Sequence, residues 1–254
     1  MIIHRNDAIV LAMVCSGLVA FGLLTGANAK DVAGRAEESP KHNTAPEGWV
    51  SLFDGATLDG WKAMSGEAEY TVEDGTILGT TVKNTPNSFL CTEKSYRDFE
   101  LVFEVFLHDR GLNSGCQVRS QVIDNNTERF KNGRIGGPQI EIASGPGYSG
   151  DCFMEGIGGW PSLYVDGKEV QGEAREARRH KHFKNDGWNY FRVRIVGDHY
   201  KTWVNGEKVA DFKMLDKHKQ RFSEGVIGLQ VHAVQDRGPF RVRWRNIYLR
   251  EIKG

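Results

Sequence analysis

Polar side chains recur at alternate positions in three short stretches of the sequence. The stretches are Gln117–Gln121, Gln139–Ile142 and Leu229–His232, and their polar members carry amide, guanidinium, carboxylate and imidazole groups. Side chains two apart in a strand share one face, so three such strands in one sheet would present a single polar face. Convergent polar groups of this kind are typical of a carbohydrate site.

Three residues of these stretches could carry out catalysis. Glu141 would act as a base or metal ligand, His232 as an acid/base partner, and Arg119 as a donor to a ketone oxygen or enolate. The alternative is that Glu141 and Arg119 pair across neighbouring strands and that His232 caps the sheet.

The pattern places one carboxylate, that of Glu141, on the expected face. An ordinary glycosidase needs two carboxylates about 5 to 10 Å apart. A ketone at C3 of the sugar changes the requirement, because it acidifies the C2 proton and places the C1 substituent β to the carbonyl. With such a substrate one base would suffice for C2 proton abstraction, β-elimination at C1 and rehydration, which together amount to hydrolysis.

Other side chains are predicted to hold the substrate. Glutamines would orient hydroxyls, an asparagine could act through its loop, and aromatic rings on a loop could stack on the C–H faces of sugars, although such rings could equally plug the sandwich edge. The residues are Gln117, Gln139, Gln230, Asn113, Trp160 and Tyr164.

A divalent metal is an open alternative. His180 and His182 would share a face in an extended segment, and Glu141 or His232 could complete the ligand set. The basic residues around the two histidines would repel a cation. No other cofactor is indicated.

The rest of the chain is punctuated as an all-β protein. Turn dipeptides at Asp54-Gly55, Asp74-Gly75, Asp166-Gly167 and Asn205-Gly206 indicate tight hairpins, and repeated short strands with such turns indicate a sandwich or barrel. A charged stretch at Glu173–His182 is the one candidate helix. The alternating stretches are Tyr70–Val72, Thr76–Leu78, Phe99–Phe106, Gln117–Ile123, Gln139–Ile142, Tyr190–Ile195, Tyr200–Val204, Val226–Val231 and Phe240–Leu249.

The sequence divides into a leader, a linker and one domain. Residues 1–29 are predicted to be a signal peptide cleaved near Ala29, because a short apolar run ends in Ala27-Asn28-Ala29. Residues 30–47 are a polar linker, and 48–254 form the domain, with a loop insertion at about 124–187. The mature protein is expected to be exported, periplasmic or extracellular, with no integral membrane span.

Charge and cysteine content limit the partners. Lys plus Arg and Asp plus Glu number 33 each, so no net field recruits nucleic acid. Cys91, Cys116 and Cys152 lack paired Cys-x-x-Cys spacing, which argues against a disulfide scaffold or zinc knuckle, and one bridge plus one buried thiol stays open. The expected partner is an oligosaccharide or glycoside, and the oligomeric state is not indicated.

A series of motifs resembles the 3-keto-disaccharide hydrolase domain family, DUF1080, in order over nearly the whole of the chain from residue 48. This resemblance implies a concanavalin/LamG-like jelly-roll β-sandwich of two antiparallel sheets and an activity on 3-keto-glycosides. The motifs are Leu52-Phe53-Asp54-Gly55, Leu58-Asp59-Gly60-Trp61, Glu73-Asp74-Gly75-Thr76-Ile77, Tyr96-Arg97-Asp98-Phe99-Glu100-Leu101, Asn113-Ser114-Gly115, Trp203-Val204-Asn205-Gly206 and Gly228-Leu229-Gln230-Val231-His232.

The chain departs from the family pattern at one strand. Where the family commonly has Glu, Gln and Asp, this chain has Gln139, Glu141 and Ser144. Two functions are carried forward: an exported enzyme that cleaves 3-keto-glycosides, and a noncatalytic carbohydrate-binding module that uses the same face.

Overall fold

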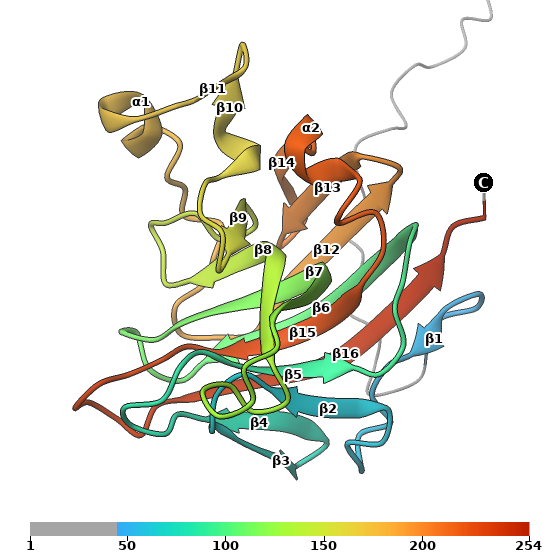
Figure 1. Ribbon diagram of the computed structural model, residues 1–254, viewed down its shortest axis with the longest axis vertical. Helices are drawn as coiled ribbons and strands as arrows, with labels where there is room; N and C mark the ends of the chain where they lie inside the picture. Colours follow the sequence, from blue (N-terminus) through green and yellow to red (C-terminus); the bar gives the residue numbers. More distant parts are fainter. Residues whose placement is uncertain (1–44, 254) are drawn as a thin grey trace, which may run out of the picture. The chain divides into compact units, whose positions relative to one another are not determined.

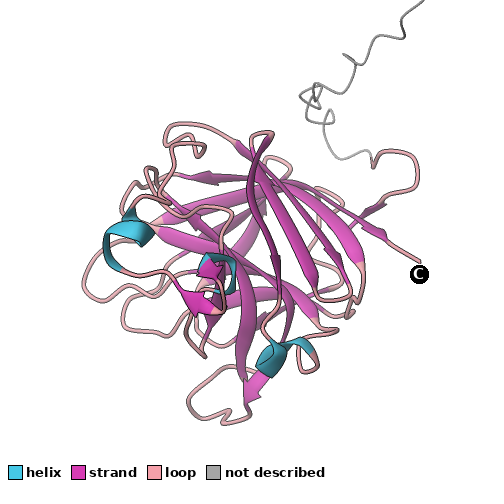
Figure 2. Cartoon of the chain, turned by 90° about the horizontal axis from the view of Figure 1, so that it is seen from above, coloured by secondary structure: helices cyan, strands magenta, loops and turns pink. Residues whose placement is uncertain are grey.

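The computed structural model describes residues 45–253, which form two antiparallel sheets and a few short helices (Figures 1 and 2). The predicted signal peptide, and most of the predicted linker, lie outside the described residues. Within 45–253 no helix has the length and apolar character needed to cross a membrane.

The larger sheet has eight strands, in the order β14-β13-β12-β6-β16-β4-β3, with β1 also paired to β16. Its strands are β1 (Val50–Ser51), β3 (Glu69–Glu73), β4 (Thr76–Thr80), β6 (Phe99–Leu107), β12 (Asn189–Val196), β13 (His199–Val204), β14 (Glu207–Lys213) and β16 (Arg241–Glu251).

The smaller sheet has six strands, in the order β2-β5-β15-β7-β8-β9. Its strands are β2 (Trp61–Met64), β5 (Ser88–Thr92), β7 (Asn113–Asp124), β8 (Arg134–Ala143), β9 (Cys152–Glu155) and β15 (Val226–Val231). The remaining elements are η1 (Pro161–Leu163), the hairpin β10 (Tyr164–Val165) and β11 (Lys168–Glu169), α1 (Gly172–Glu176) and α2 (Asp216–Lys219).

Alternating apolar residues build the core between the two sheets. Phe103 on β6 and Phe191 on β12 are fully buried and their rings stack at 5.1 Å, while Val118, Ile140 and Leu229 of the six-stranded sheet belong to the same core cluster. Two inner faces that interdigitate in this way are the core of a β-sandwich. The predicted jelly-roll class is thereby confirmed.

Three of the four turn dipeptides close hairpins. Asp74-Gly75, Asp166-Gly167 and Asn205-Gly206 have positive φ at both residues and join β3 to β4, β10 to β11 and β13 to β14. Positive φ at both central residues is what a tight type I′ hairpin requires. Asp54-Gly55 differs, because the Asp54 carboxylate accepts hydrogen bonds from the backbone N–H groups of Ala56 and Thr57 and forms an Asx turn in a connecting loop.

The segment predicted as a long irregular insertion contains more structure than expected. Besides β8 it holds β9, the β10–β11 hairpin, η1 and α1, and α1 overlaps the candidate helix only at 173–176. Cys91, Cys116 and Cys152 are free and buried, so the bridge considered from the sequence is not formed. Burial raises the pKa of all three thiols, which keeps them protonated.

Candidate functional site

The outer face of the six-stranded sheet gathers the polar side chains. In the strand register Gln117 lies beside Gln139, Glu141 lies beside Gly115, and Gln139 lies beside Phe153 of β9. Residues directly opposite in adjacent strands project to the same side, so these positions share one face. We call this surface, formed by β15, β7, β8 and β9, the polar face.

Hydrogen bonds link five side chains of the polar face into one chain. Ser120 donates to Gln117, and the Gln117 amide donates to the Gln139 carbonyl oxygen at 2.7 Å. The Gln139 amide in turn donates to Glu141 at 3.3 Å, and Asn113 donates to the other Glu141 oxygen. Gln117 and Gln139 are almost fully buried, so their amides serve to orient the carboxylate rather than to offer open contacts to substrate hydroxyls.

Gly115 makes this network geometrically feasible. A Cβ at Gly115 would lie 2.3 Å from Cδ of Gln139, well inside van der Waals contact. The Gln139 side chain therefore lies over the backbone of β7, where it reaches both Gln117 and Glu141. A glycine at this point of the strand is explained by close approach rather than by a turn.

Glu141 has an unusual protonation equilibrium. Its side chain is 7% exposed, and burial raises its pKa from the ordinary 4.5 to about 7, against the lowering effect of the hydrogen bonds from Asn113 and Gln139. Glu155 and Asp151 raise the pKa further through charge repulsion. A carboxylate that is half ionised near neutral pH is suited to exchange protons with a substrate.

Two further carboxylates lie close to Glu141, and the sequence-based expectation of a lone carboxylate is therefore wrong. Glu155 occupies the same parity of β9 as Phe153, and Asp151 lies beside Glu141, whose backbone N–H donates to the Asp151 carbonyl at 2.9 Å. Burial raises the pKa of the Asp151 carboxyl to about 6, although Ser162 donates a hydrogen bond to it. The alternation within Cys152–Glu155 indicates a strand with Glu155 on its outer face. The stretch is short and lies in a glycine-rich segment, which hides that pattern.

Glu155 connects the carboxylates to β15 and to the loop before β5. Asn87 donates to one Glu155 oxygen at 3.2 Å and Gln230 donates to the other at 3.4 Å. The side-chain oxygen of Gln230 is buried and has no hydrogen-bond donor among the described residues. Gln230 therefore lies on the polar face beside Glu155, and it retains one unused acceptor.

His232 immediately follows β15 and is half buried. Its Nδ1 lies 2.9 Å from the carbonyl oxygen of Ala233, and a carbonyl can only accept, so Nδ1 carries a proton and Nε2 of the neutral ring is the free acceptor. The Ala233 N–H donates to Asn87, which also binds Glu155. These contacts place His232 next to the Glu155 end of the polar face.

Arg119 does not lie on the polar face, which corrects its predicted role as an enolate donor. One extra residue in β7 forms a bulge between Gln117 and Gln121, and Arg119 has a left-handed φ of 53°. The side chain is 1% exposed and binds Asp98 at 2.7 Å and the Gly197 carbonyl at 2.6 Å. A bulge re-aims the side chains around it, so Arg119 points into the sandwich and binds the loops of the other sheet.

One family model matches most of the described chain. The sequence profile described as a 3-keto-alpha-glucoside-1,2-lyase-like domain matches residues 48–250, which include the whole polar face. The chain belongs to this family. Among curated proteins, none matches the chain.

Solved structures share the fold of this 3-keto-alpha-glucoside-1,2-lyase-like domain. A protein from Parabacteroides distasonis described as a glycosyl hydrolase is 21% identical, with a TM-score of 0.56 over 84% of this chain and 100% of the other. A galectin-like protein from Bacillus subtilis is 9% identical, with a TM-score of 0.50 over 76% and 90%. An endo-β-galactosidase from Clostridium perfringens is 11% identical, with a TM-score of 0.50 over 83% and 64%.

Aromatic rings border the polar face of this 3-keto-alpha-glucoside-1,2-lyase-like domain at β9. The Trp160 ring lies 5.0 Å from that of Phe153 and 5.4 Å from that of Tyr148, and the Arg175 guanidinium lies 5.0 Å from the Trp160 ring. Phe153 is adjacent to Gln139, so Trp160 reaches the edge of the site. Tyr164 lies on the β10–β11 hairpin opposite Glu169, and within residues 45–253 no side-chain hydrogen bond or ring contact joins it to the polar face.

His180 and His182 lie together on the segment that pairs with Gly147. Their ring centroids are 4.5 Å apart. Within residues 45–253 no group of three or more histidine, cysteine, aspartate or glutamate side chains is arranged to hold a metal ion. The ligand set considered from the sequence, which joined these histidines to Glu141, is therefore not assembled.

Proposed function

We propose that the protein cleaves 3-keto-glycosides, with Glu141 as the base that removes the C2 proton. The observation that carries the proposal is a buried carboxylate with a pKa of about 7, held by two amide donors on a polar sheet face. Membership in a 3-keto-alpha-glucoside-1,2-lyase-like family supports the same substrate class.

The reaction proceeds through an enolate. Glu141 accepts the C2 proton, and the electrons of the C–H bond form an enolate with the C3 ketone. The enolate collapses to a C1=C2 double bond and breaks the bond from C1 to the leaving oxygen, which takes up a proton. Water then adds at C1 while C2 regains a proton, so that the net change is hydrolysis.

His232 is the proposed acid for the leaving oxygen. Its Nδ1 hydrogen bond to Ala233 fixes the ring, so that Nε2 of the imidazolium form gives a proton to the leaving oxygen and then takes one back from the water that adds at C1. His232→Ala is expected to lower kcat by roughly 10²-fold or more, as loss of a positioned acid does. The melting temperature should change little, because the ring is half buried and makes one hydrogen bond. Equal loss of activity and folding would instead make His232 structural.

The pH dependence of kcat/KM should report Glu141. The base must be ionised to accept the C2 proton and the acid must be protonated, so a bell-shaped profile is expected whose rising limb passes through an apparent pKa near 7, where burial places Glu141. Below about pH 6 the slope of log(kcat/KM) should approach one. An activity that is flat from about pH 5 to pH 8 would show that a different group is the base.

Glu155 favours a second candidate, ordinary glycoside hydrolysis by two carboxylates. Glu155 lies on the same face as Glu141 and its charge raises the Glu141 pKa, as in an acid and nucleophile pair. That mechanism needs both carboxylates and acts on an unoxidised glycoside, whereas elimination needs the C3 ketone.

One experiment separates these functions and the binding-module alternative. The purified protein is incubated with a 3-keto-disaccharide and with its unoxidised parent, and released monosaccharide is measured. Turnover of the keto sugar alone, retained within about tenfold in Glu155→Gln, supports elimination. Cleavage of the parent sugar that is lost in Glu155→Gln supports the two-carboxylate mechanism, and saturable binding without product supports a carbohydrate-binding module.

We also propose that the protein acts outside the cytoplasm. The proposal rests on the apolar run and the Ala27-Asn28-Ala29 site of the sequence, both outside the described residues. Amino-terminal sequencing of the protein from a periplasmic or extracellular fraction should start at Lys30, and recovery of the intact Met1 terminus from the cytoplasm would contradict export.

A further inference from the structure

A cavity of about 310 Å³ opens beside the polar face. Phe89 forms part of its lining and is the register partner of Gln230, and Asn87 and Glu155, which hydrogen bond to each other, also line it. The cavity is therefore continuous with the end of the polar face at which Gln230 and His232 lie. Its volume falls within the range of small-ligand sites.

Two arginines line this cavity without a charged partner. The guanidinium groups of Arg129 and Arg134 lie 5.1 Å and 5.4 Å from the centre of the Phe130 ring, which is itself buried and lines the cavity. Within residues 45–253 neither guanidinium forms an ion pair or donates a hydrogen bond. Most arginines on the opposite sheet differ in this respect, as Arg192, which binds Glu100, illustrates.

Among residues 45–253, Glu155 is the one acidic group that lines the cavity, and each of its oxygens already accepts a hydrogen bond from a neutral amide. One of its oxygens accepts from Asn87 and the other from Gln230. Two guanidinium groups against one carboxylate leave a net positive charge in a partly enclosed space. Arginine presents a planar fork of N–H donors that matches a carboxylate or sulfate group, and such charge-assisted bonds are stronger than neutral ones.

We propose that this cavity binds an anionic substituent of the sugar, a carboxylate or a sulfate, through Arg129 and Arg134. The preferred substrate is then an acidic glycoside whose charged unit lies beside Glu155 while the cleaved unit lies over Glu141. The placement of the cleaved unit over Glu141 rests on the proposed function. The binding of the acidic unit beside Glu155 does not, because binding an acidic sugar needs no cleavage.

The test uses calorimetric titration of the full mature chain with unoxidised sugars. The probes are cellobiouronic acid, 6-O-sulfated cellobiose and neutral cellobiose, at low and at high salt. We expect at least one acidic sugar to bind at least tenfold more tightly than cellobiose, with an affinity that falls as salt rises. Tighter binding of one acidic probe than the other identifies the substituent.

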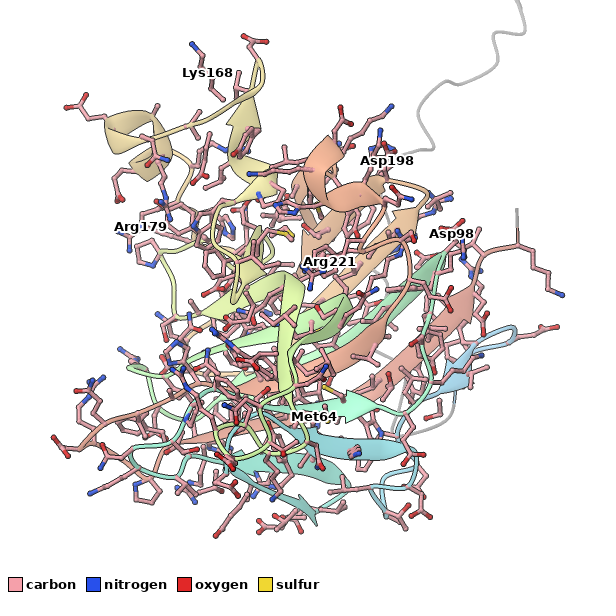
Figure 3. All side chains as sticks on the ribbon, in the orientation of Figure 1. Met64, Asp98, Lys168, Arg179, Asp198 and Arg221 are labelled. Atoms are coloured by element: carbon pink, nitrogen blue, oxygen red, sulfur yellow. The ribbon has the colours of Figure 1, made fainter. Side chains whose placement is uncertain are left out.

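The single variant Arg134→Gln should weaken the binding of the acidic sugar by roughly tenfold and so remove its preference over cellobiose. The double variant Arg129→Gln/Arg134→Gln should remove the preference as well. Arg221→Gln is the matched control, because Arg221, labelled in Figure 3, lies 5.3 Å from the ring of Phe222 and is not among the residues that line the cavity. Equal binding of acidic and neutral sugars, unchanged affinities in the double variant, or no binding of either acidic sugar would overturn the inference. None of these results depends on turnover of the 3-keto-disaccharide, so the two proposals can fail separately.

Discussion

Glu141→Gln is expected to lower kcat on a 3-keto-disaccharide by roughly 10²–10⁴-fold, the range that a positioned general base contributes. Glutamine keeps the size and shape of the carboxyl and its oxygen can still accept from Asn113, although its NH2 group cannot accept from Gln139, so one hydrogen bond of the polar face is lost. It cannot accept the C2 proton. The measurement is single-turnover release of monosaccharide, which reports the chemical step rather than product release.

The same substitution should change how folding depends on pH. The folded carboxyl has a pKa of about 7 against an ordinary 4.5, so the folded state holds a proton that the unfolded state has lost between these values. The stability that this proton gives is complete below pH 4.5 and is lost as pH rises through 7. The rise in pKa from 4.5 to about 7 corresponds to a loss of about 3 kcal/mol in the free energy of unfolding between acid and alkaline pH. The variant Glu141→Gln has no carboxyl to titrate at this position and should not show that loss.

The comparison is between urea unfolding at about pH 4.5 and at about pH 8 for wild type and variant. Other titrating groups are common to both proteins and cancel in the difference. Glu67→Gln is the control, because the Glu67 side chain is 60% exposed and pairs with Lys131 at the surface. A parallel pH dependence of wild type and Glu141→Gln would mean that Glu141 is ionised at neutral pH in the folded protein.

Most strands of the fold can be predicted from the period-two alternation of the sequence. Eight of the nine alternating stretches lie wholly within strands and the ninth begins one residue before β16, because each has one face in the core and the other outside it. β5 was not predicted, since all five of its residues are buried and Ser88–Thr92 shows no alternation. β2 and β9 have four residues each, too few to establish a period, and the order of strands in each sheet is set by long-range pairing that no local pattern encodes.

The same difference between regular and irregular sequence decides which residues of the polar face can be predicted. Gln117, Gln139, Glu141 and Gln230 were found because they keep strict alternation within regular parts of their strands. Glu155 was missed because the irregular sequence around it hides a short strand. On β2 the outer face carries an apolar residue instead of a polar one. Met64, labelled in Figure 3, packs there against Phe89 in a small second apolar cluster beside the cavity.

Arg119→Met is expected to destabilise the fold by about 3–5 kcal/mol, the cost of breaking a buried ion pair by removing one partner. The guanidinium is 1% exposed and binds Asp98 at 2.7 Å, the Gly197 carbonyl at 2.6 Å and the Arg97 carbonyl. Asp98 lies at the start of β6 (Figure 3), and Gly197 is in the turn from β12 to β13. Arg119 thus joins the bulge of one sheet to two loops of the other, and its loss leaves their acceptors without a donor.

Arg97→Met provides the matched control, since the Arg97 side chain is 68% exposed, pairs with Glu224 and should cost less than about 1 kcal/mol. Arg119→Lys keeps the charge but not the fork of donors, and an intermediate loss is expected. Well below its melting temperature Arg119→Met should retain kcat within a few-fold, because the side chain points away from Glu141. If Arg119→Met is folded, has unchanged stability and has lost turnover, then Arg119 acts as a donor to the enolate after all. That result would also require β7 to present that side chain on the polar face, contrary to the bulge at Gln117–Gln121.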